Sequence, residues 1–411
     1  MTLQAPGNSG LQAFISSPMR VRAESGIWPE YAWLWRLSPD LEEVIWAFGR
    51  NGQTYHGCAD YIELTDSQIY ALGGHPGFGT WVGADYENLV QLASVDYDGN
   101  YLWGINPRDR DDVPGGGDDT SRFAYRNCAV DDGGNLYVLV NKDIGDGRQT
   151  YLWKIAPSGA IVWTWHGGYR EDKYWAAPVE NLCFCGGCIM CCTRYRYNDT
   201  WDGNAGPGDY ATWWKIDPDT GVVVWHTDSI YGATKLYSDG EHLWLYGSLH
   251  VVKRSPVDLS HLWGWGFSGS YIHRSARCVP ANGHIIVSFD PANTIWDESN
   301  GACANVVELD LQGHPVWHAN LPERLMGSDA SDPEGYPRQM AASANNVWVI
   351  GWAVEEGYSR GDERIVQLTR EPNPIVRGRW AVRHPGRLGG IGFRDEKLVV
   401  GGQPATRWDG K

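Results

Sequence analysis

Cysteines crowd into one ten-residue stretch, Cys183 to Cys192, which carries five of the nine in the chain. Closely spaced thiolates can supply the sulfur ligands of zinc or pair as a disulfide. However, the matching strands of other repeats carry Leu, Tyr and Val here, and a cysteine thiol packs like a small apolar side chain. Alternation along a strand would also divide these thiols between two faces. We therefore interpret the stretch as a buried strand and predict no metal site, with metal binding and redox chemistry as the alternatives.

The twelve histidines form no His-Glu-x-x-His motif. His226 and His318 each directly follow a recurring tryptophan, which makes them repeat positions rather than ligands. A phosphate-binding loop is missing from the sequence. Paired carboxylates occur, but all of them sit among turn residues. We predict no catalytic residue, no bound cofactor and no metal ligand.

Two polar insertions are candidate binding sites, one for calcium and one for a sugar or a protein partner. The segment 106–122 places five aspartates around Gly115-Gly116-Gly117, a composition that can hold calcium, although its order is not that of an EF-hand. A solvated rim loop is the favoured interpretation. The second insertion interleaves aromatic rings with Asn and Asp, and rings of this kind stack on sugars or anchor protein partners. Packing against neighbouring repeats is the favoured interpretation, with a binding surface as the alternative. The candidate contact residues of that surface are Tyr195, Tyr197, Trp201 and Tyr210.

Composition excludes several classes of protein. The 411 residues carry a formal net charge of −16, which disfavours binding to nucleic acid. Apolar runs stay short of the ~20 residues that a membrane-spanning helix needs. The first residues lack the basic and apolar regions of a secretory signal, and the odd number of cysteines does not suggest a disulfide framework. We expect synthesis in a reducing compartment.

A repeated hairpin positions all of these residues. Its best copy runs from Trp213 to Trp225, where an alternating strand meets an Asp/Pro/Thr/Gly turn and a second strand ends on tryptophan. A second hairpin element alternates with it, as in Asp132–Val138, where a polar Gly-containing turn precedes an apolar strand. Each element occurs seven times. The residues that mark the repeat are Trp46, Trp163, Trp225, Trp263, Trp317, Trp380, Gly159, Gly221 and Gly313.

Two hairpins per unit make a four-stranded antiparallel blade, and about 59 residues per unit leave room for loops. We therefore predict an all-β fold, a single seven-bladed β-propeller over residues 1–411, with eight blades as the alternative. A string of separate small β-domains is disfavoured because no flexible linker divides the repeats. The N-terminal segment 1–24 precedes the first hairpin, and we expect it to help complete the last blade.

The best repeat resembles the tryptophan-docking motif of PQQ-dependent (quinoprotein) dehydrogenase propellers, through Asp217, Thr220-Gly221 and Trp225. The resemblance implies that each tryptophan packs between blades and that a Thr-Gly turn receives it. Those enzymes also carry adjacent cysteines near the cofactor, which Cys191-Cys192 resembles. The calcium ligands and the catalytic base of the family cannot be placed here, so we expect a PQQ-like repeat without the enzyme.

These observations predict a non-enzymatic structural or binding propeller. Among such proteins we favour a component of a bacteriophage virion or tail, oligomeric within the assembly, whose partners are other structural proteins or a host-surface glycan or protein. The expected location is the virion, with the cytoplasm as the alternative. Two other functions remain open: a soluble protein- or glycan-binding propeller, and a PQQ-dependent dehydrogenase-like enzyme.

Overall fold

The fold consists of β-strands joined by short turns. The structure, a computed structural model, describes residues 21–22, 32–49, 59, 61–73, 92–105, 122–143, 148–167, 179–193, 211–229, 235–246, 250–266, 277–289, 305–320, 325–326, 339–353, 363–372, 374–382 and 387–403. Its strands build seven antiparallel sheets, which confirms the predicted all-β fold of seven four-stranded blades. We number these sheets as blades 1 to 7. Contacts divide the chain into two compact units, 107–267 and the remainder, and each is described by itself.

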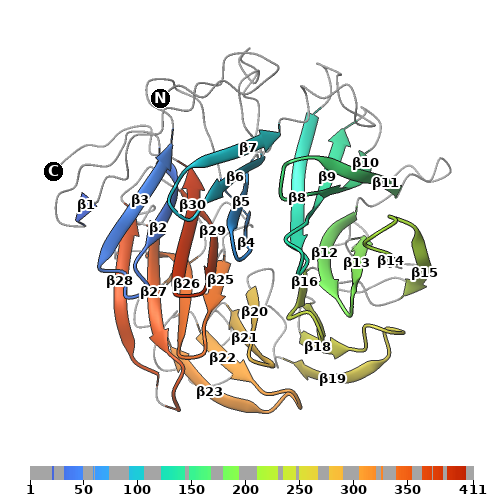
Figure 1. The fold of residues 1–411 in the computed structure, drawn as a ribbon. Helices are drawn as coiled ribbons and strands as arrows, with labels where there is room; N and C mark the ends of the chain where they lie inside the picture. Colours follow the sequence, from blue (N-terminus) through green and yellow to red (C-terminus); the bar gives the residue numbers. More distant parts are fainter. Residues whose placement is uncertain are drawn as a thin grey trace. The chain divides into compact units, whose positions relative to one another are not determined.

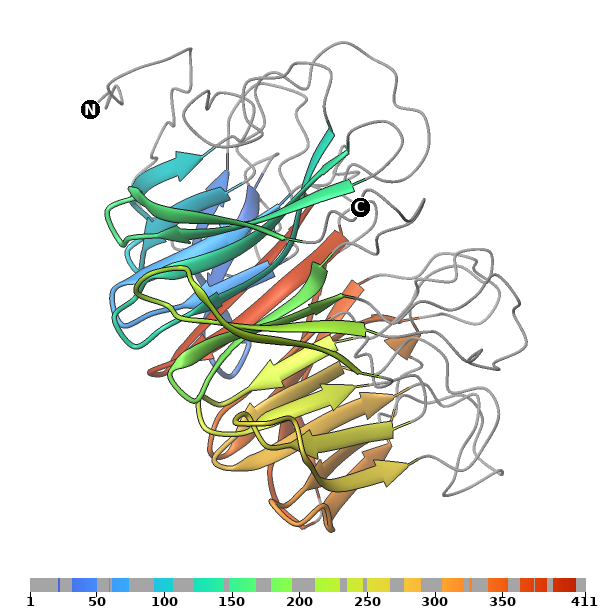
Figure 2. The same cartoon turned by 90° about the vertical axis from the view of Figure 1, so that its right-hand side faces the viewer.

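The central unit contains three blades, each contiguous in sequence (Figure 1). Blade 3 consists of β8 (Arg122–Val130), β9 (Leu136–Asp143), β10 (Arg148–Ile155) and β11 (Ile161–Gly167). Blade 4 consists of β12 (Val179–Cys185), β13 (Cys188–Thr193), β14 (Ala211–Ile216) and β15 (Val223–Ser229). Blade 5 consists of β16 (Lys235–Ser238), β17 (Leu243–Tyr246), β18 (His250–Arg254) and β19 (His261–Gly266). In Figure 2 these hairpins follow one another from green to yellow.

The other unit contains blades 2, 6, 7 and 1. Blade 2 consists of β4 (Tyr61–Leu64), β5 (Gln68–Leu72), β6 (Leu92–Asp96) and β7 (Tyr101–Ile105). Blade 6 consists of β20 (Arg277–Ala281), β21 (His284–Phe289), β22 (Asn305–Leu309) and β23 (Pro315–Asn320). Blade 7 consists of β25 (Gln339–Ala342), β26 (Asn346–Ala353), β27 (Glu363–Thr369) and β28 (Val376–Val382), with β24 (Leu325–Met326) paired to β26.

Blade 1 combines strands from both ends of the chain. Its order is β29 (Arg387–Arg394), β30 (Lys397–Gln403), β2 (Ala32–Leu37) and β3 (Glu43–Gly49), and β2 pairs with β30 through Leu34↔Gly401 to Leu37↔Leu398. Figure 1 shows this pairing as a blue strand beside a red one. Of the N-terminal segment 1–24, the described part is β1 (Val21–Arg22), which pairs with β3 at the outer edge of the same sheet. The remainder of that segment lies outside the described residues.

The hairpin between the third and fourth strands has the same register in every blade. A β-bulge interrupts each one directly before the last paired residue of the third strand, as at Lys215/Ile216. In four blades a glycine at positive φ closes the turn: Gly99, Gly159, Gly221 and Gly313. Glycine adopts this conformation without steric cost. Leu41 and Leu259 hold this conformation in blades 1 and 5, where their side chains are buried.

Apolar side chains between successive blades form the core. Trp213, Met190 and Cys192 of blade 4 pack against Leu243 and Leu259 of blade 5. The other face of blade 4 packs on blade 3, where Cys191 and Ile216 join a cluster with further residues of β9 and β10. Blade 4 is therefore buried on both faces, which is the reason for the nearly continuous apolar runs in its middle strands.

Candidate functional site

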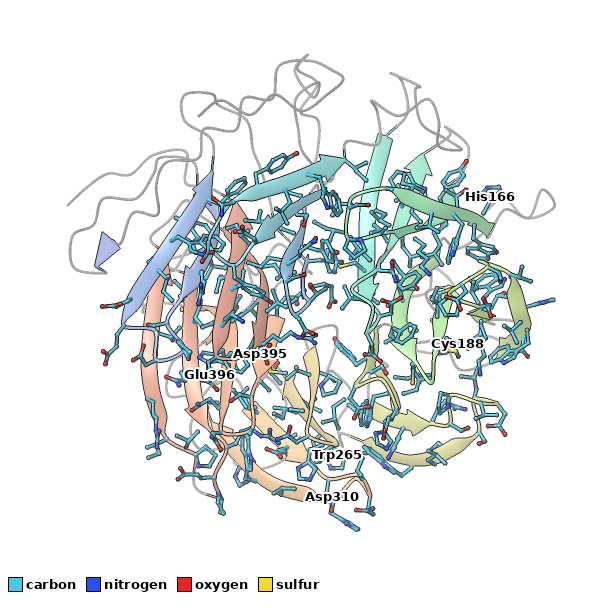
Figure 3. All side chains as sticks on the ribbon, in the orientation of Figure 1. His166, Cys188, Trp265, Asp310, Asp395 and Glu396 are labelled. Atoms are coloured by element: carbon cyan, nitrogen blue, oxygen red, sulfur yellow. The ribbon has the colours of Figure 1, made fainter. Side chains whose placement is uncertain are left out.

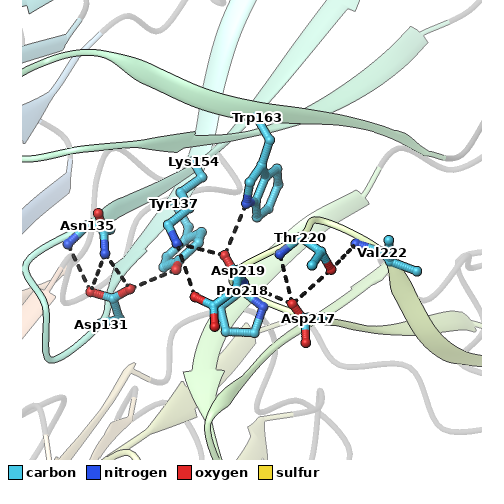
Figure 4. Close-up of polar contacts among 10 residues, drawn as sticks. All are labelled: Asp131, Asn135, Tyr137, Lys154, Trp163, Asp217, Pro218, Asp219, Thr220 and Val222. Carbon is cyan, nitrogen blue, oxygen red and sulfur yellow. Dashed lines mark hydrogen bonds and ion pairs between the residues drawn. The ribbon is translucent and has the colours of Figure 1, made fainter.

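Several of the recurring tryptophans meet the next blade at a shared kind of contact, which we call the blade joint. At the joint of blades 3 and 4, Trp163 Nε1 donates to the carbonyl oxygen of Pro218 at 3.0 Å (Figure 4). Lys154, the cross-strand partner of Trp163, donates from Nζ to the same oxygen at 2.8 Å. The indole ring lies on Gly221, where an added Cβ would come within 2.9 Å of it. The structure thus brings two predicted residues, Trp163 and Gly221, into direct contact.

The turn that receives Trp163 is held by its own side chains. The Asp217 carboxylate accepts from the backbone N–H of Thr220 at 2.8 Å and from the Thr220 hydroxyl at 2.9 Å (Figure 4). These hydrogen bonds lower the pKa of Asp217 below its usual value. The Thr220 hydroxyl in turn accepts from the N–H of Val222 at 3.3 Å. Hence the Asp, Thr and Gly of the sequence motif shape the turn, and the glycine leaves space for the neighbouring indole.

A tyrosine completes the joint of blades 3 and 4. Lys154 Nζ lies 5.8 Å from the ring centroid of Tyr137, within reach of a cation–π contact. The Tyr137 hydroxyl donates to Asp131 at 2.7 Å, and Asp131 also accepts from the backbone of Asn135 (Figure 4). Burial, followed by the Asp131 hydrogen bond, raises the pKa of Tyr137 above its usual value. These contacts lie within blade 3 and hold Lys154 where it bonds to the Pro218 carbonyl oxygen of blade 4.

Two other joints repeat the arrangement. At blades 1 and 2, Arg36 Nη1 and Trp46 Nε1 both donate to the Tyr97 carbonyl oxygen, at 2.7 and 2.8 Å. Gly99 of the same turn lies against the Trp46 ring. At blades 4 and 5, Lys215 Nζ donates to the Pro256 carbonyl oxygen at 3.3 Å, while Trp225 packs on the cluster around Leu259.

The joint of blades 6 and 7 reverses the charges. Glu308 stands where the three joints described above carry Arg36, Lys154 or Lys215, and its cross-strand partner Trp317 donates to it at 2.5 Å. Arg370 of blade 7 donates to both of its carboxylate oxygens, at 3.0 and 2.6 Å, and His284 contacts it at 2.5 Å. Burial opposes ionisation of Glu308, but the hydrogen bonds from Arg370 and His284 outweigh it and lower the pKa. The joint therefore keeps a buried carboxylate ionised.

The joint of blades 7 and 1 lacks the repeat tryptophan. Trp380 pairs with Ile365, and Gly378 occupies the register position that faces the polar residue Gln367. The predicted repeat position is therefore two residues off in this blade. Trp348 of β26 takes over the contact, because its Nε1 donates to the Pro39 carbonyl oxygen at 2.9 Å. The side chain of Trp348 is fully buried.

The polar residue opposite each tryptophan was missing from the prediction. It is Arg36, Ser94, Lys154, Lys215, Lys253 or Glu308, depending on the blade, and in blade 7 the equivalent residue Gln367 faces Gly378. The signal was available, because each of these residues is a polar position one or two residues before the end of a largely apolar third strand. Gly159 and Gly313 adopt a positive φ as Gly221 does, and Trp263 pairs with Lys253 at the equivalent register.

The cysteine stretch lies within blade 4. Cys183, Cys185, Met190 and Cys192 are buried in the cluster facing blade 5, whereas Cys191 faces blade 3. Adjacent Cys191 and Cys192 therefore point to opposite faces and do not reproduce the cysteine pair of the quinoprotein resemblance. Among the residues that the structure describes, no group of three or more His, Cys, Asp or Glu side chains could hold a metal ion.

Other candidates fall outside the described residues. These are Tyr195, Tyr197, Trp201 and Tyr210, together with nearly all of the acidic insertion 106–122. His226, His314 and His318 are exposed, and His314 Nδ1 lies 3.2 Å from the Asp310 carboxylate in a hairpin turn. In the described part of the chain we find no helix with the length and apolarity that crossing a membrane requires.

The fold places this chain in the class of seven-bladed β-propellers. Solved structures similar to it include the Neurospora crassa Pan2 WD40 domain (12% identity, 85% of this chain and 90% of that one, TM-score 0.46). The Myceliophthora thermophila Cps50 (Swd1) β-propeller domain is similar at 10% identity, with 86% and 99% covered and a TM-score of 0.46. The dihydro-heme d1 dehydrogenase NirN is similar at 12% identity, with 90% and 68% covered and a TM-score of 0.45. No protein-family model and no curated protein matches the chain.

Proposed function

We propose that this chain is a non-enzymatic β-propeller that binds other proteins through the outer edges of its blades. One observation carries the proposal: an exposed aliphatic side chain directly precedes the tryptophan position on the outer strand of five blades. These side chains are between 44% and 56% exposed, and they are Leu102, Val162, Val224, Leu262 and Val316. A single exposed aliphatic residue is ordinary on a protein surface. Recurrence at one register position indicates a shared role.

The outer strands also offer their backbone. β7, β11, β15, β19 and β23 each end their sheet as described, so each presents an edge to which an extended segment can add a strand. Blade 1 shows such an addition within the chain, because β1 pairs with the edge of β3 through Val21↔Val44 and Arg22↔Glu43. A partner strand with apolar side chains at alternate positions would cover the exposed aliphatic residues.

The blade joints fit a scaffold. Arg36, Lys154, Lys215 and Glu308 are bonded to the neighbouring blade rather than directed at a shared site. Charged groups that are hydrogen-bonded across a joint favour one specific packing of the two blades. A chain built this way supplies a rigid support for binding edges.

The proposal also names a family of repeats and an assembly to which the chain would belong. The contact of Trp163 with Gly221 is what the quinoprotein-like motif implies, which supports membership of the PQQ-like repeat propellers. We also propose a place in a large assembly such as a bacteriophage virion or tail, in contact with structural proteins or a host surface. The acidic composition, which keeps a protein soluble at high local concentration, is compatible with this role.

Density-gradient fractionation of the native source tests the proposal, with the chain followed by mass spectrometry. Co-sedimentation with a megadalton particle is the expected result, and recovery only as a free 45.8 kDa chain would refute the assembly role.

Strand addition at the blade edges is tested with the double variant Val162→Lys/Val224→Lys, because lysine on an exposed edge blocks the pairing of a further strand. The matched control is Ser158→Lys, an exposed position in a turn. Loss of partner binding in both proteins would exclude the blade edges.

A further inference from the structure

Two cysteine thiols face each other across the tip of the hairpin between β12 and β13. Cys185 ends the first strand and Cys188 begins the second, and the two residues are cross-strand partners. Gly186 and Gly187 form the turn between them, both at positive φ (58° and 69°). All seven described cysteines are in the thiol form. Figure 3 labels Cys188 at this tip.

The spacing suits a disulfide. Directly opposed residues of antiparallel strands have Cα atoms about 4.5–5.5 Å apart, and disulfides join Cα atoms about 4.4–6.8 Å apart. Cys183 faces Met190 instead, while Cys191 and Cys192 face Leu182 and Asn181 on one side and tryptophans on the other. Among the described cysteines, Cys185 and Cys188 form the one directly opposed pair.

The two thiols differ in access to solvent. The side chain of Cys185 is fully buried against blade 5, where it makes a hydrogen bond with the Ser238 side chain. Burial raises the pKa of Cys185, and the Ser238 contact offsets only part of this. Cys188 is partly exposed. Redox-active pairs typically combine an accessible thiol that is attacked first with a resolving thiol beside it.

We propose that Cys185 and Cys188 form a reversible dithiol–disulfide site that is oxidised by low-molecular-weight disulfides of the glutathione class. The Cys188 thiolate attacks the small disulfide, forms a mixed disulfide and releases one small thiolate. The Cys185 thiolate then attacks the Cys188 sulfur and expels the second small thiolate. The two protein thiols lose two protons and two electrons, and the small disulfide gains both as two thiols.

The site adjoins a contact between blades. The Gly186 N–H donates to the Gly240 carbonyl oxygen of blade 5 at 2.7 Å, and Cys185 forms an isolated parallel bridge with Gly240. A bridge to Cys188 would take the Cys185 sulfur away from Ser238 while the backbone contact stays in place. The redox state of the pair would therefore act at the joint of blades 4 and 5.

Differential alkylation of the folded full-length protein tests this proposal. After incubation with glutathione disulfide, thiols are blocked with a light reagent, and bridged cysteines are reduced and labelled with a heavy one. The tryptic peptide from 174 to 194 carries all five cysteines of the stretch, so tandem mass spectrometry locates the heavy label. Heavy label on Cys185 and Cys188 alone, reversed by dithiothreitol before blocking, is the expected result.

Variants separate the two steps. In Cys185→Ser, Cys188 should accumulate as the glutathione adduct, whereas in Cys188→Ser the buried Cys185 should stay reduced. Cys191→Ser, the matched control, should form the bridge like the wild type. The proposal is overturned if wild-type protein keeps light label on both positions, stops at the glutathione adduct, or forms the bridge only after unfolding in urea. Wild-type mapping decides the question even where a variant fails to fold.

Discussion

Replacing Gly221 with alanine tests whether the blade joint depends on contact with the tryptophan. Gly221 has φ +71°, and a Cβ there would lie 2.9 Å from Cδ2 and 3.0 Å from Cε3 of Trp163. Cβ atoms almost never come within 3.0 Å of another carbon, so the indole must shift away from the turn. The shift would stretch the hydrogen bond from Trp163 to Pro218, which is 3.0 Å long.

Another glycine of the chain provides a matched control for the cost of placing alanine at positive φ. Gly187 has nearly the same φ, +69°, but a Cβ there meets nothing within 4 Å. Placing alanine at positive φ costs about 1–2 kcal/mol, which both variants share. Gly221→Ala adds the overpacking of a buried contact, about 1–3 kcal/mol, and the weakened hydrogen bond, about 1 kcal/mol. We expect Gly221→Ala to lower the free energy of unfolding by roughly 2–4 kcal/mol more than Gly187→Ala.

Urea unfolding followed by far-UV circular dichroism and tryptophan fluorescence measures both variants. The comparison is sound if the two signals give coincident transitions with unchanged slopes. Adding Trp163→Leu to each variant removes the ring, and the costs of the two glycine substitutions should then become equal. Equal costs in the wild-type background would refute the idea that Gly221 is required to receive Trp163.

Other titratable residues give further predictions. Burial raises the pKa of Glu63 to about 8, so its contribution to stability is complete below pH ~4.5 and is lost as the pH rises through 8. Between pH ~4.5 and 8 the free energy of unfolding should therefore fall by up to ~1.4 kcal/mol per pH unit, and Glu63→Gln should abolish this fall. Urea unfolding at pH 5, 7 and 9 measures it, and the same pH dependence in the variant would contradict a raised pKa of Glu63. The lowered pKa of Glu308 has the opposite sign, so stability that is complete above pH ~4.5 should fall as acid protonates it. Glu308→Gln leaves buried Arg370 without its anion and should cost about 3–5 kcal/mol, whereas Glu371→Gln, in an exposed pair, should change the melting temperature little. Similar losses of stability in the two variants would show that the buried pair of Glu308 and Arg370 contributes no more than the exposed pair.

The repeat could be predicted because its chemistry is local. The turn around Asp217 and Gly221 is determined by residues within five positions of one another, and the same pattern recurs along the chain. The alternation of apolar and polar residues along each strand therefore predicted the hairpins, their number and the class of fold. The alternation of two hairpin types also indicated four strands per blade.

Joints between blades depend on residues far apart in sequence. Trp348 compensates for Gly378 by bonding to Pro39, and no local pattern links these three positions. Glu308 likewise stands at a position where other blades have a cation, and the reason is its partner Arg370, which lies in the next blade. The opposed pair Cys185–Cys188 required the register of β12 on β13, which its two-glycine turn determines. Aromatic rings at 195–210 lie outside the described residues, so their contact role stays a prediction.

The composition of blade 1 also dictates an order of folding. Blades 2 to 7 each use one continuous stretch of chain, and their hairpins can close as that stretch leaves the ribosome. β2 has no strand to pair on its inner side until Lys397–Gln403 has been made. The first hairpin must therefore wait through most of synthesis with an open edge, when it is exposed to mispairing with other chains. Removal of β30 would make this early state permanent, so aggregation during synthesis, rather than loss of a surface, is the expected defect of such a truncation.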